Sequence, residues 1–275
     1  MDNILIILIL IILLGWNTLG HTQTTSTKDG TLFSWLFDQN ASFSESIATD
    51  RPTFSLGAGT VPKKHVQFET GYTFSVDGAR PNTTTHTFPE TLIRIGLTDT
   101  FEMRLEWPTQ TFINSDTKQS GLEDLALGFK TQIFQQQKWM PQFSIAGRLS
   151  IPTGNRKLSS NHVDTELQTI WSYVLNERFS LFGNVNIGSA GSQNKRFAQF
   201  SSSLGLGVNL GNSLSGFMEY FGFYPVQADS RNLHSLQTGL IYQITYNLQL
   251  DARVGAGLNH NADDLFTGAG LSWRF

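Results

Sequence analysis

The chain has 275 residues, no cysteine, 25 glycines and 21 phenylalanines; charged residues make up 15% of it and its formal net charge is −3. The absence of cysteine excludes a disulfide framework and thiol chemistry, and a slightly acidic chain without a basic patch argues against a nucleic-acid partner. Soluble proteins usually have about 25% charged residues, so this composition is more typical of a barrel whose outer face meets lipid.

An apolar run from Ile4 to Leu14 lies near the start of the chain. It is shorter than the ~18 residues that a membrane-spanning helix needs. The run is followed by Thr18-Leu19-Gly20, a small-residue step typical of a cleavage site, so residues 1–20 are predicted to be a secretory signal. Because Met1-Asp2-Asn3 carries no lysine or arginine, an uncleaved membrane anchor is the alternative.

Residues 21–63 show no sustained hydrophobic period and are rich in threonine, serine and asparagine. Polar segments without a period are typical of irregular structure. We therefore expect an irregular periplasmic leader that packs near the mouth of the barrel.

From residue 64 onward, apolar side chains alternate with polar or small ones. The clearest segment is 101–107, in which Glu102, Arg104 and Glu106 fall on one face and the apolar residues on the other. A period of two predicts a strand, because a helix would mix these two sets. The same reading predicts twelve strands, at about 64–75, 88–97, 101–107, 122–134, 142–151, 163–175, 179–188, 197–210, 214–224, 233–244, 248–258 and 265–275.

The connections between these strands alternate in length. Those after every second strand are short, and the others are mostly longer and polar, at 76–87, 108–121, 152–162, 189–196, 225–232 and 259–264. Short periplasmic turns and longer extracellular loops are typical of bacterial outer-membrane barrels, which have an even number of strands. The fold class predicted is therefore all-β, a twelve-stranded antiparallel transmembrane barrel over residues 64–275 with both termini in the periplasm. A soluble β-sandwich is the alternative.

The last predicted strand, 265–275, ends on an aromatic residue at the end of the chain. It resembles the closing strand of a bacterial outer-membrane barrel, whose terminus is read by the assembly machinery. This resemblance implies that Trp273 and Phe275 form an assembly signal.

Several stretches resemble one family of outer-membrane barrels, whose members are called transporters or are named for the MetA pathway of phenol degradation. They are ATDRP at 48–52, VPKKHVQFETGY at 61–72, FPETLIRIGLTD at 88–99, GLEDLALG at 121–128 and IPTG at 151–154. The resemblance extends over roughly residues 48 to 275. It implies a role near the uptake of aromatic compounds, although the matching stretches are mostly strands and turns.

Charged residues on the predicted inner face are the candidate lining of the lumen. They are Glu69, Glu90, Arg94, Glu102, Arg104, Glu106, Lys130, Arg148, Asp164, Glu166, Glu219, Asp251 and Arg253. They form either a selectivity lining or cross-strand ion pairs that fill a nearly closed barrel. The densest group, Glu102, Arg104 and Glu106 with Arg94 on the neighbouring strand, is hypothesised to form a constriction.

Three functions follow from this sequence. The first is a channel or facilitated-diffusion transporter for small solutes, with hydrophobic or aromatic compounds as candidates. The second is a structural or adhesive barrel with a filled lumen. The third, a hydrolase, is disfavoured because the adjacent pair His234-Ser235 would point to opposite faces of a strand. No catalytic residue, cofactor or metal is predicted; the expected partners are the lipid bilayer, the assembly machinery and a small solute.

Overall fold

The computed structural model describes residues 45–78, 82–192, 195–226 and 231–275. The predicted signal at 1–20 and the first part of the predicted leader lie outside these residues, so both stay predictions. Within the described ranges, no helix is long and apolar enough to cross a membrane.

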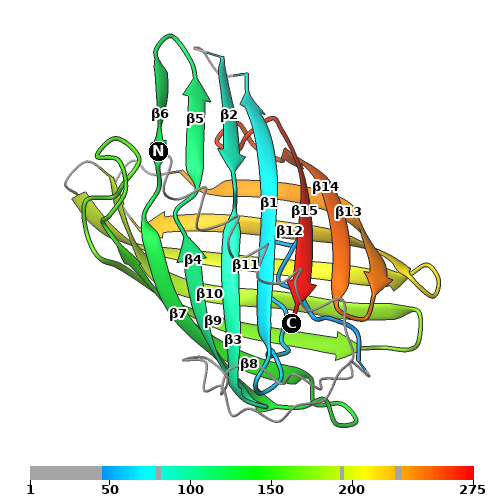
Figure 1. The fold of residues 1–275 in the computed structure, drawn as a ribbon. Helices are drawn as coiled ribbons and strands as arrows, with labels where there is room; N and C mark the ends of the chain where they lie inside the picture. The colour runs from blue at the N-terminus through cyan, green and yellow to red at the C-terminus, as the bar shows by residue number, and fades with distance from the viewer. Residues whose placement is uncertain (1–44, 79–81, 193–194, 227–230) are drawn as a thin grey trace, which may run out of the picture. The chain divides into compact units, whose positions relative to one another are not determined.

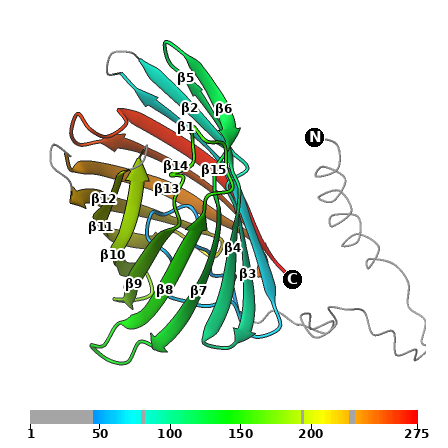
Figure 2. The ribbon, with the colours of Figure 1, turned by 90° about the vertical axis from the view of Figure 1, so that its left-hand side faces the viewer.

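The described residues form one antiparallel sheet of fifteen strands, in which β15 also pairs with β1 and closes a barrel (Figures 1 and 2). The strands are β1 (Val66–Asp77), β2 (Thr83–Phe88), β3 (Thr91–Thr98), β4 (Phe101–Trp107), β5 (Gln110–Asn114), β6 (Lys118–Leu122), β7 (Leu125–Phe134), β8 (Gln142–Ile151), β9 (Asp164–Val174), β10 (Phe179–Ser192), β11 (Lys195–Asn209), β12 (Leu214–Val226), β13 (Leu233–Thr245), β14 (Leu248–Gly257) and β15 (Leu265–Arg274).

Twelve of these strands make the closed wall, which confirms the predicted strand number. The other three, β2, β5 and β6, continue the lines of β3, β4 and β7 and rise above the wall (Figure 1). The break between β2 and β3 falls at Pro89, and the break between β4 and β5 falls at Pro108. The proline ring removes the backbone N–H that the hydrogen bonds between strands need.

The predicted loops at 76–87 and 108–121 were wrong in part, because they contain the end of β1 together with β2, β5 and most of β6. The predicted loop at 189–196 likewise contains the ends of β10 and β11. These segments carry mostly polar or small side chains on both faces, so the hydrophobic alternation that marks the wall strands is missing, yet they still pair with one another.

The two faces of the wall have opposite chemistry. Outward side chains such as Met218, Leu204 and Val185 are more than half exposed, whereas Glu219 and Arg94 on the inner face are completely buried. An apolar exterior around a polar interior reverses the arrangement of a soluble protein and is typical of a membrane barrel. This excludes the soluble β-sandwich.

The closing seam joins the first and last strands in continuous register, with Gly71 opposite Gly270. The terminal Phe275 takes part in it, because its N–H donates to the carbonyl of Val66 at 2.8 Å. The ring of Phe275 also lies 4.2 Å from that of Trp273, measured between centroids. The end of the chain is therefore fixed at the seam.

Candidate functional site

We call residues 45–63 the inner segment. Its ends are exposed, whereas Asp50, Ser55, Ala58 and Val61 are buried inside the barrel. The segment is anchored at the end of the barrel that carries the short connections, which we call the short-turn end. At one side the N–H of Ile47 donates to the carbonyl of Tyr246 between β13 and β14 at 2.8 Å. At the other, the hydroxyl of Thr60 donates to the carbonyl of Asp99 between β3 and β4 at 2.9 Å.

Three wall glutamates accept hydrogen bonds from the backbone of the inner segment. Glu69 on β1 accepts from the N–H groups of Asp50 and Arg51 at 3.0 and 3.1 Å. Glu219 on β12 accepts from those of Phe54 and Ser55, both at 2.8 Å. Glu102 on β4 accepts from that of Val61 at 2.7 Å. A buried segment outside the sheet must find partners for its N–H groups, and these carboxylates supply them.

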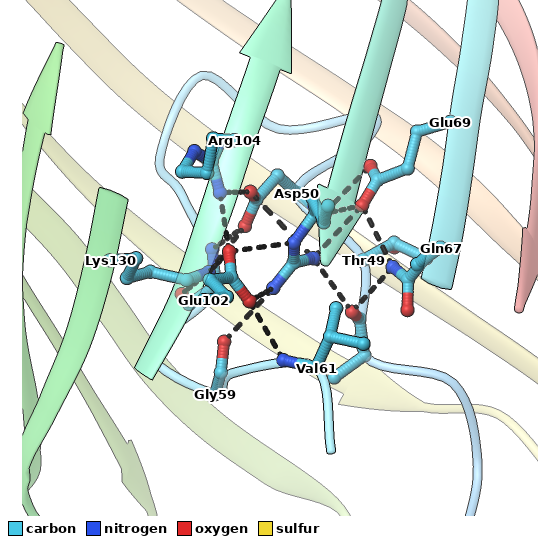
Figure 3. A network of polar contacts seen from close by, with 12 residues as sticks. Thr49, Asp50, Gly59, Val61, Gln67, Glu69, Glu102, Arg104 and Lys130 are labelled. Carbon is cyan, nitrogen blue, oxygen red and sulfur yellow. Dashed lines mark hydrogen bonds and ion pairs between the residues drawn. The ribbon is translucent and has the colours of Figure 1, made fainter. Parts of the chain in front are cut away.

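Asp50 lies among three cations of the wall, Arg94, Arg104 and Lys130, of which Arg104 and Lys130 are labelled in Figure 3. Its carboxylate is 2.5 Å from Arg104, 3.1 Å from Lys130 and 3.7 Å from Arg94. Burial alone would raise the pKa of this carboxyl, but the three cations outweigh burial and hold the pKa well below its usual range. Asp50 therefore stays ionised inside the lumen.

Arg94 connects this group to the wall glutamates. Its guanidinium contacts Glu69 and Glu102, each at 2.9 Å, and it also donates to the carbonyls of Ala48 and Gly59 in the inner segment. The side chains of Arg94, Glu69 and Glu102 are fully buried. Removing one partner from such a network leaves an uncompensated buried charge, which typically costs about 3–5 kcal/mol.

Arg51 reaches the closing seam. Its guanidinium lies 2.9 Å from Glu90 and 3.4 Å from Asp251. It occupies the space where side chains at Gly71 and Gly270 would otherwise project, since a Cβ at either position would overlap it. Glycine at both positions thus allows the inner segment to lie directly against the β1–β15 pair.

The remaining charges predicted for the lumen lie elsewhere in the barrel. Arg253 donates to the carbonyl of Pro52 at 3.2 Å and so contacts the inner segment. Outside the group around Asp50, Glu106 pairs with Arg148 at 2.8 Å, Glu166 accepts from Gln168 at 3.1 Å, and Asp164 is 4.0 Å from Arg196.

The structure thus brings together three members of the hypothesised constriction, Arg94, Glu102 and Arg104, while Glu106 pairs with Arg148 instead. Sequence reasoning missed Asp50, the carboxylate that Arg94 and Arg104 share with Lys130, because residues 45–63 have no hydrophobic period to place them. The sequence did contain one signal for the inner segment: residues 48–52 resemble the family although they belong to no predicted strand.

Sequence reasoning also missed an aromatic cluster in the lumen. The ring of Phe54 stacks on that of Phe221 with centroids 4.7 Å apart, and Phe223 meets it edge-on at 5.2 Å. Phe266 lies 6.0 Å from Phe221. The alternation of β12 could have revealed two of these rings, because Phe221 and Phe223 share the inner face with Glu219.

Two of the cavities in the described part of the barrel lie toward opposite ends of the lumen. One of about 490 Å³ opens toward the short-turn end and is lined by the inner segment and by neutral side chains such as Phe182, Gln243 and Gln249. The other, of about 370 Å³, lies toward the opposite end and is lined by residues that include Arg148, Glu166 and Phe223. Among the described residues, no cluster of histidine and acidic side chains could hold a metal ion.

A closed wall with an apolar outer face and a charged, partly filled lumen defines an outer-membrane β-barrel. Residues 49–275 match the family described as "Putative MetA-pathway of phenol degradation", so the chain belongs to that family. The match includes most of the inner segment as well as the strands.

Solved structures give the same fold. An outer membrane channel from Pseudomonas putida F1 is 15% identical with a TM-score of 0.65, over 79% of this chain and 98% of that one. The NanC porin is 9% identical with a TM-score of 0.50, over 76% and 98%. No curated protein matches the sequence significantly.

Replacing Asp50 by alanine should release the inner segment. The change leaves Arg94, Arg104 and Lys130 without their shared carboxylate, and we expect docking to weaken by about 3–5 kcal/mol. Because the chain has no cysteine, Ala58→Cys provides a single reporter at a position that is 4% exposed. Its thiol should react slowly with a maleimide in the parent and quickly after Asp50→Ala. Equal rates would contradict the proposed anchoring, and Glu177→Cys in an exposed turn controls for reagent reactivity.

The same reporter should reveal how docking depends on pH. The pKa of Asp50 is lowered in the docked state. The contribution of its carboxylate to the free energy of docking is therefore complete above the solvated pKa of about 3.9, and it is lost as the pH falls below that value toward the lowered pKa of the docked state. Protection of the Ala58→Cys thiol should therefore persist at about pH 5 and weaken only below about pH 4. A dithiopyridine reagent, which reacts with thiols in acid, measures this rate. Loss of protection between about pH 7 and 5 would contradict the assignment.

Proposed function

We propose that this protein is a channel of the bacterial outer membrane for small solutes, and that the inner segment sets the width of its lumen. The observation that carries the proposal is the segment itself, which is held inside the wall by Glu69, Glu102 and Glu219 and leaves cavities of about 490 and 370 Å³ along the lumen. Family membership supports the proposal, as does the fold shared with an outer membrane channel.

Hydrophobic or aromatic compounds are the proposed solutes. The aromatic cluster of Phe54, Phe221 and Phe223 gives the lumen an apolar surface between charged regions. The family description, which names phenol degradation, points the same way.

We further propose that the short-turn end faces the periplasm, so that both termini lie there. Short turns on the periplasmic side and long loops outside are usual in such barrels. The inner segment is anchored at Tyr246 and Asp99, both at this end. A role without catalysis fits the placement of Ser235, which is buried toward the lumen, whereas His234 bonds to Tyr220 at 2.6 Å.

The second candidate is a structural or adhesive barrel with a filled lumen. It is favoured by the buried ion pairs around Asp50, because cross-strand and segment-to-wall ion pairs can fill the interior of a small barrel. Measured passage of ions and solutes separates the two functions.

Single-channel recording of the refolded protein tests the channel directly. In Arg94→Ala and Arg104→Ala, the loss of a cation loosens the inner segment and leaves the lumen more acidic, so conductance should rise several-fold with a shift toward cations. Arg148→Ala is the control for the loss of a lumen cation alone, because Arg148 pairs with Glu106 rather than with the inner segment; it should shift selectivity toward cations without the several-fold rise in conductance. Conductance and selectivity unchanged from wild type in both variants would exclude this role for the network.

The terminal aromatic pair, Trp273 and Phe275, is proposed as the signal for the assembly machinery. Phe275→Ser should lower the amount of folded protein in the outer membrane several-fold, measured as the heat-modifiable band of isolated membranes. Phe134→Ser, which changes an aromatic residue at the end of another strand, is the control. An equal reduction in both variants would argue for a general loss of stability.

A further inference from the structure

Phe54 contacts the wall by ring stacking. Its ring is nearly parallel to that of Phe221, at 7°, while Phe223 presents its edge at 85°. One stacked neighbour and one edge-on neighbour is the arrangement that aromatic rings favour. We call Phe221, Phe223 and Phe266 the aromatic seat, and Phe54 occupies it.

The backbone of Phe54 is held independently of its ring. Its N–H donates to Glu219, which also accepts from the N–H and the hydroxyl of Ser55. Rotation about the Cα–Cβ bond would therefore move the ring off the seat while the inner segment stays docked.

The seat is within reach of a solute in the lumen. Phe54 is only partly buried, and Phe223 also lines the cavity of about 370 Å³. That volume lies in the range of small-molecule sites. A solute that enters this cavity meets the seat without displacing the backbone of the inner segment.

We propose that the aromatic seat is a binding site for an uncharged aromatic solute, whose ring takes the place of the Phe54 ring. This inference rests on the proposed channel function and identifies where the solute binds. Phe54 then acts as a built-in competitor that fills the seat when solute is absent.

The charges around the seat favour a neutral ring. Glu219, fully buried beside Phe54, already takes its hydrogen bonds from Phe54, Ser55 and Gln237. A carboxylate on the solute would add a second buried negative charge, which is costly without a partner. The guanidinium of Arg253 lies over Phe266 at 5.9 Å; its Nη1 and Nη2 donate to Pro52 and Thr73, and its Nε has no hydrogen-bond partner among the described residues.

Benzyl alcohol is a suitable probe, titrated by ligand-observed NMR against the refolded full chain in nanodiscs. Phe54→Ala removes the competitor, so benzyl alcohol should bind about fivefold more tightly than to wild type, the factor that one stacking contact is worth. Adding Phe221→Ala should abolish binding; Phe221→Leu, which keeps most of the volume, serves if that variant does not fold. Phe182→Ala is the matched control, because Phe182 faces the other cavity. Cyclohexylmethanol and benzoate control for aromaticity and charge.

Tighter binding in Phe54→Ala but not in Phe182→Ala, with weaker binding of both control ligands, supports the proposal. Equal affinity in wild type and Phe54→Ala, or equal binding of cyclohexylmethanol, overturns it. Absence of binding in a protein that conducts ions overturns this inference and leaves the channel function standing. If the protein neither binds the probe nor conducts ions, the channel function fails as well.

Discussion

The structure depends on the hydrogen bonds between buried wall carboxylates and the backbone of the inner segment. A chain that crosses a lumen outside the sheet has unpaired N–H groups, and burying them without partners is unfavourable. Glu69 on β1 and Glu102 on β4 lie close together on one side of the wall, and Glu219 on β12 lies on the side opposite β4; together they meet this need at three points of the segment. The position of the segment, the cavities beside it and the placement of the aromatic seat all follow from these contacts.

The charged network around Asp50 adds specificity to this arrangement. Ionised groups are costly to bury, and their attraction compensates only when geometry and hydrogen bonding are good. Here Arg94, Arg104 and Lys130 surround one carboxylate of the inner segment. If the inner segment were shifted by one residue along the lumen, these three cations would lose the carboxylate of Asp50. The contact of Arg51 with the closing seam also fixes the position of the inner segment, because only the glycine pair at 71 and 270 leaves room for its guanidinium.

Much of the wall could be predicted from the sequence, because a strand between lipid and a polar lumen must alternate. That constraint gave twelve strands and placed Glu102 and Arg104 on the inner face. The inner segment could not be predicted, since its contacts join residues such as Ser55 and Glu219 that are far apart in sequence and follow no local period. The pairing of β2, β5 and β6 was missed for a related reason. Their mostly polar residues do not show the alternation of apolar and polar side chains that contact with lipid requires of the wall strands.

The central claim is that the inner segment, held by wall carboxylates, sets the width of the lumen. The most direct test is single-channel recording of a barrel in which residues 46–60 are replaced by a glycine-serine linker of equal length, with folding checked by heat modifiability. The wall keeps its own ion pairs, such as Arg94 with Glu69 and Glu102. The account predicts a several-fold larger conductance than that of wild type. A folded barrel with unchanged conductance would contradict it.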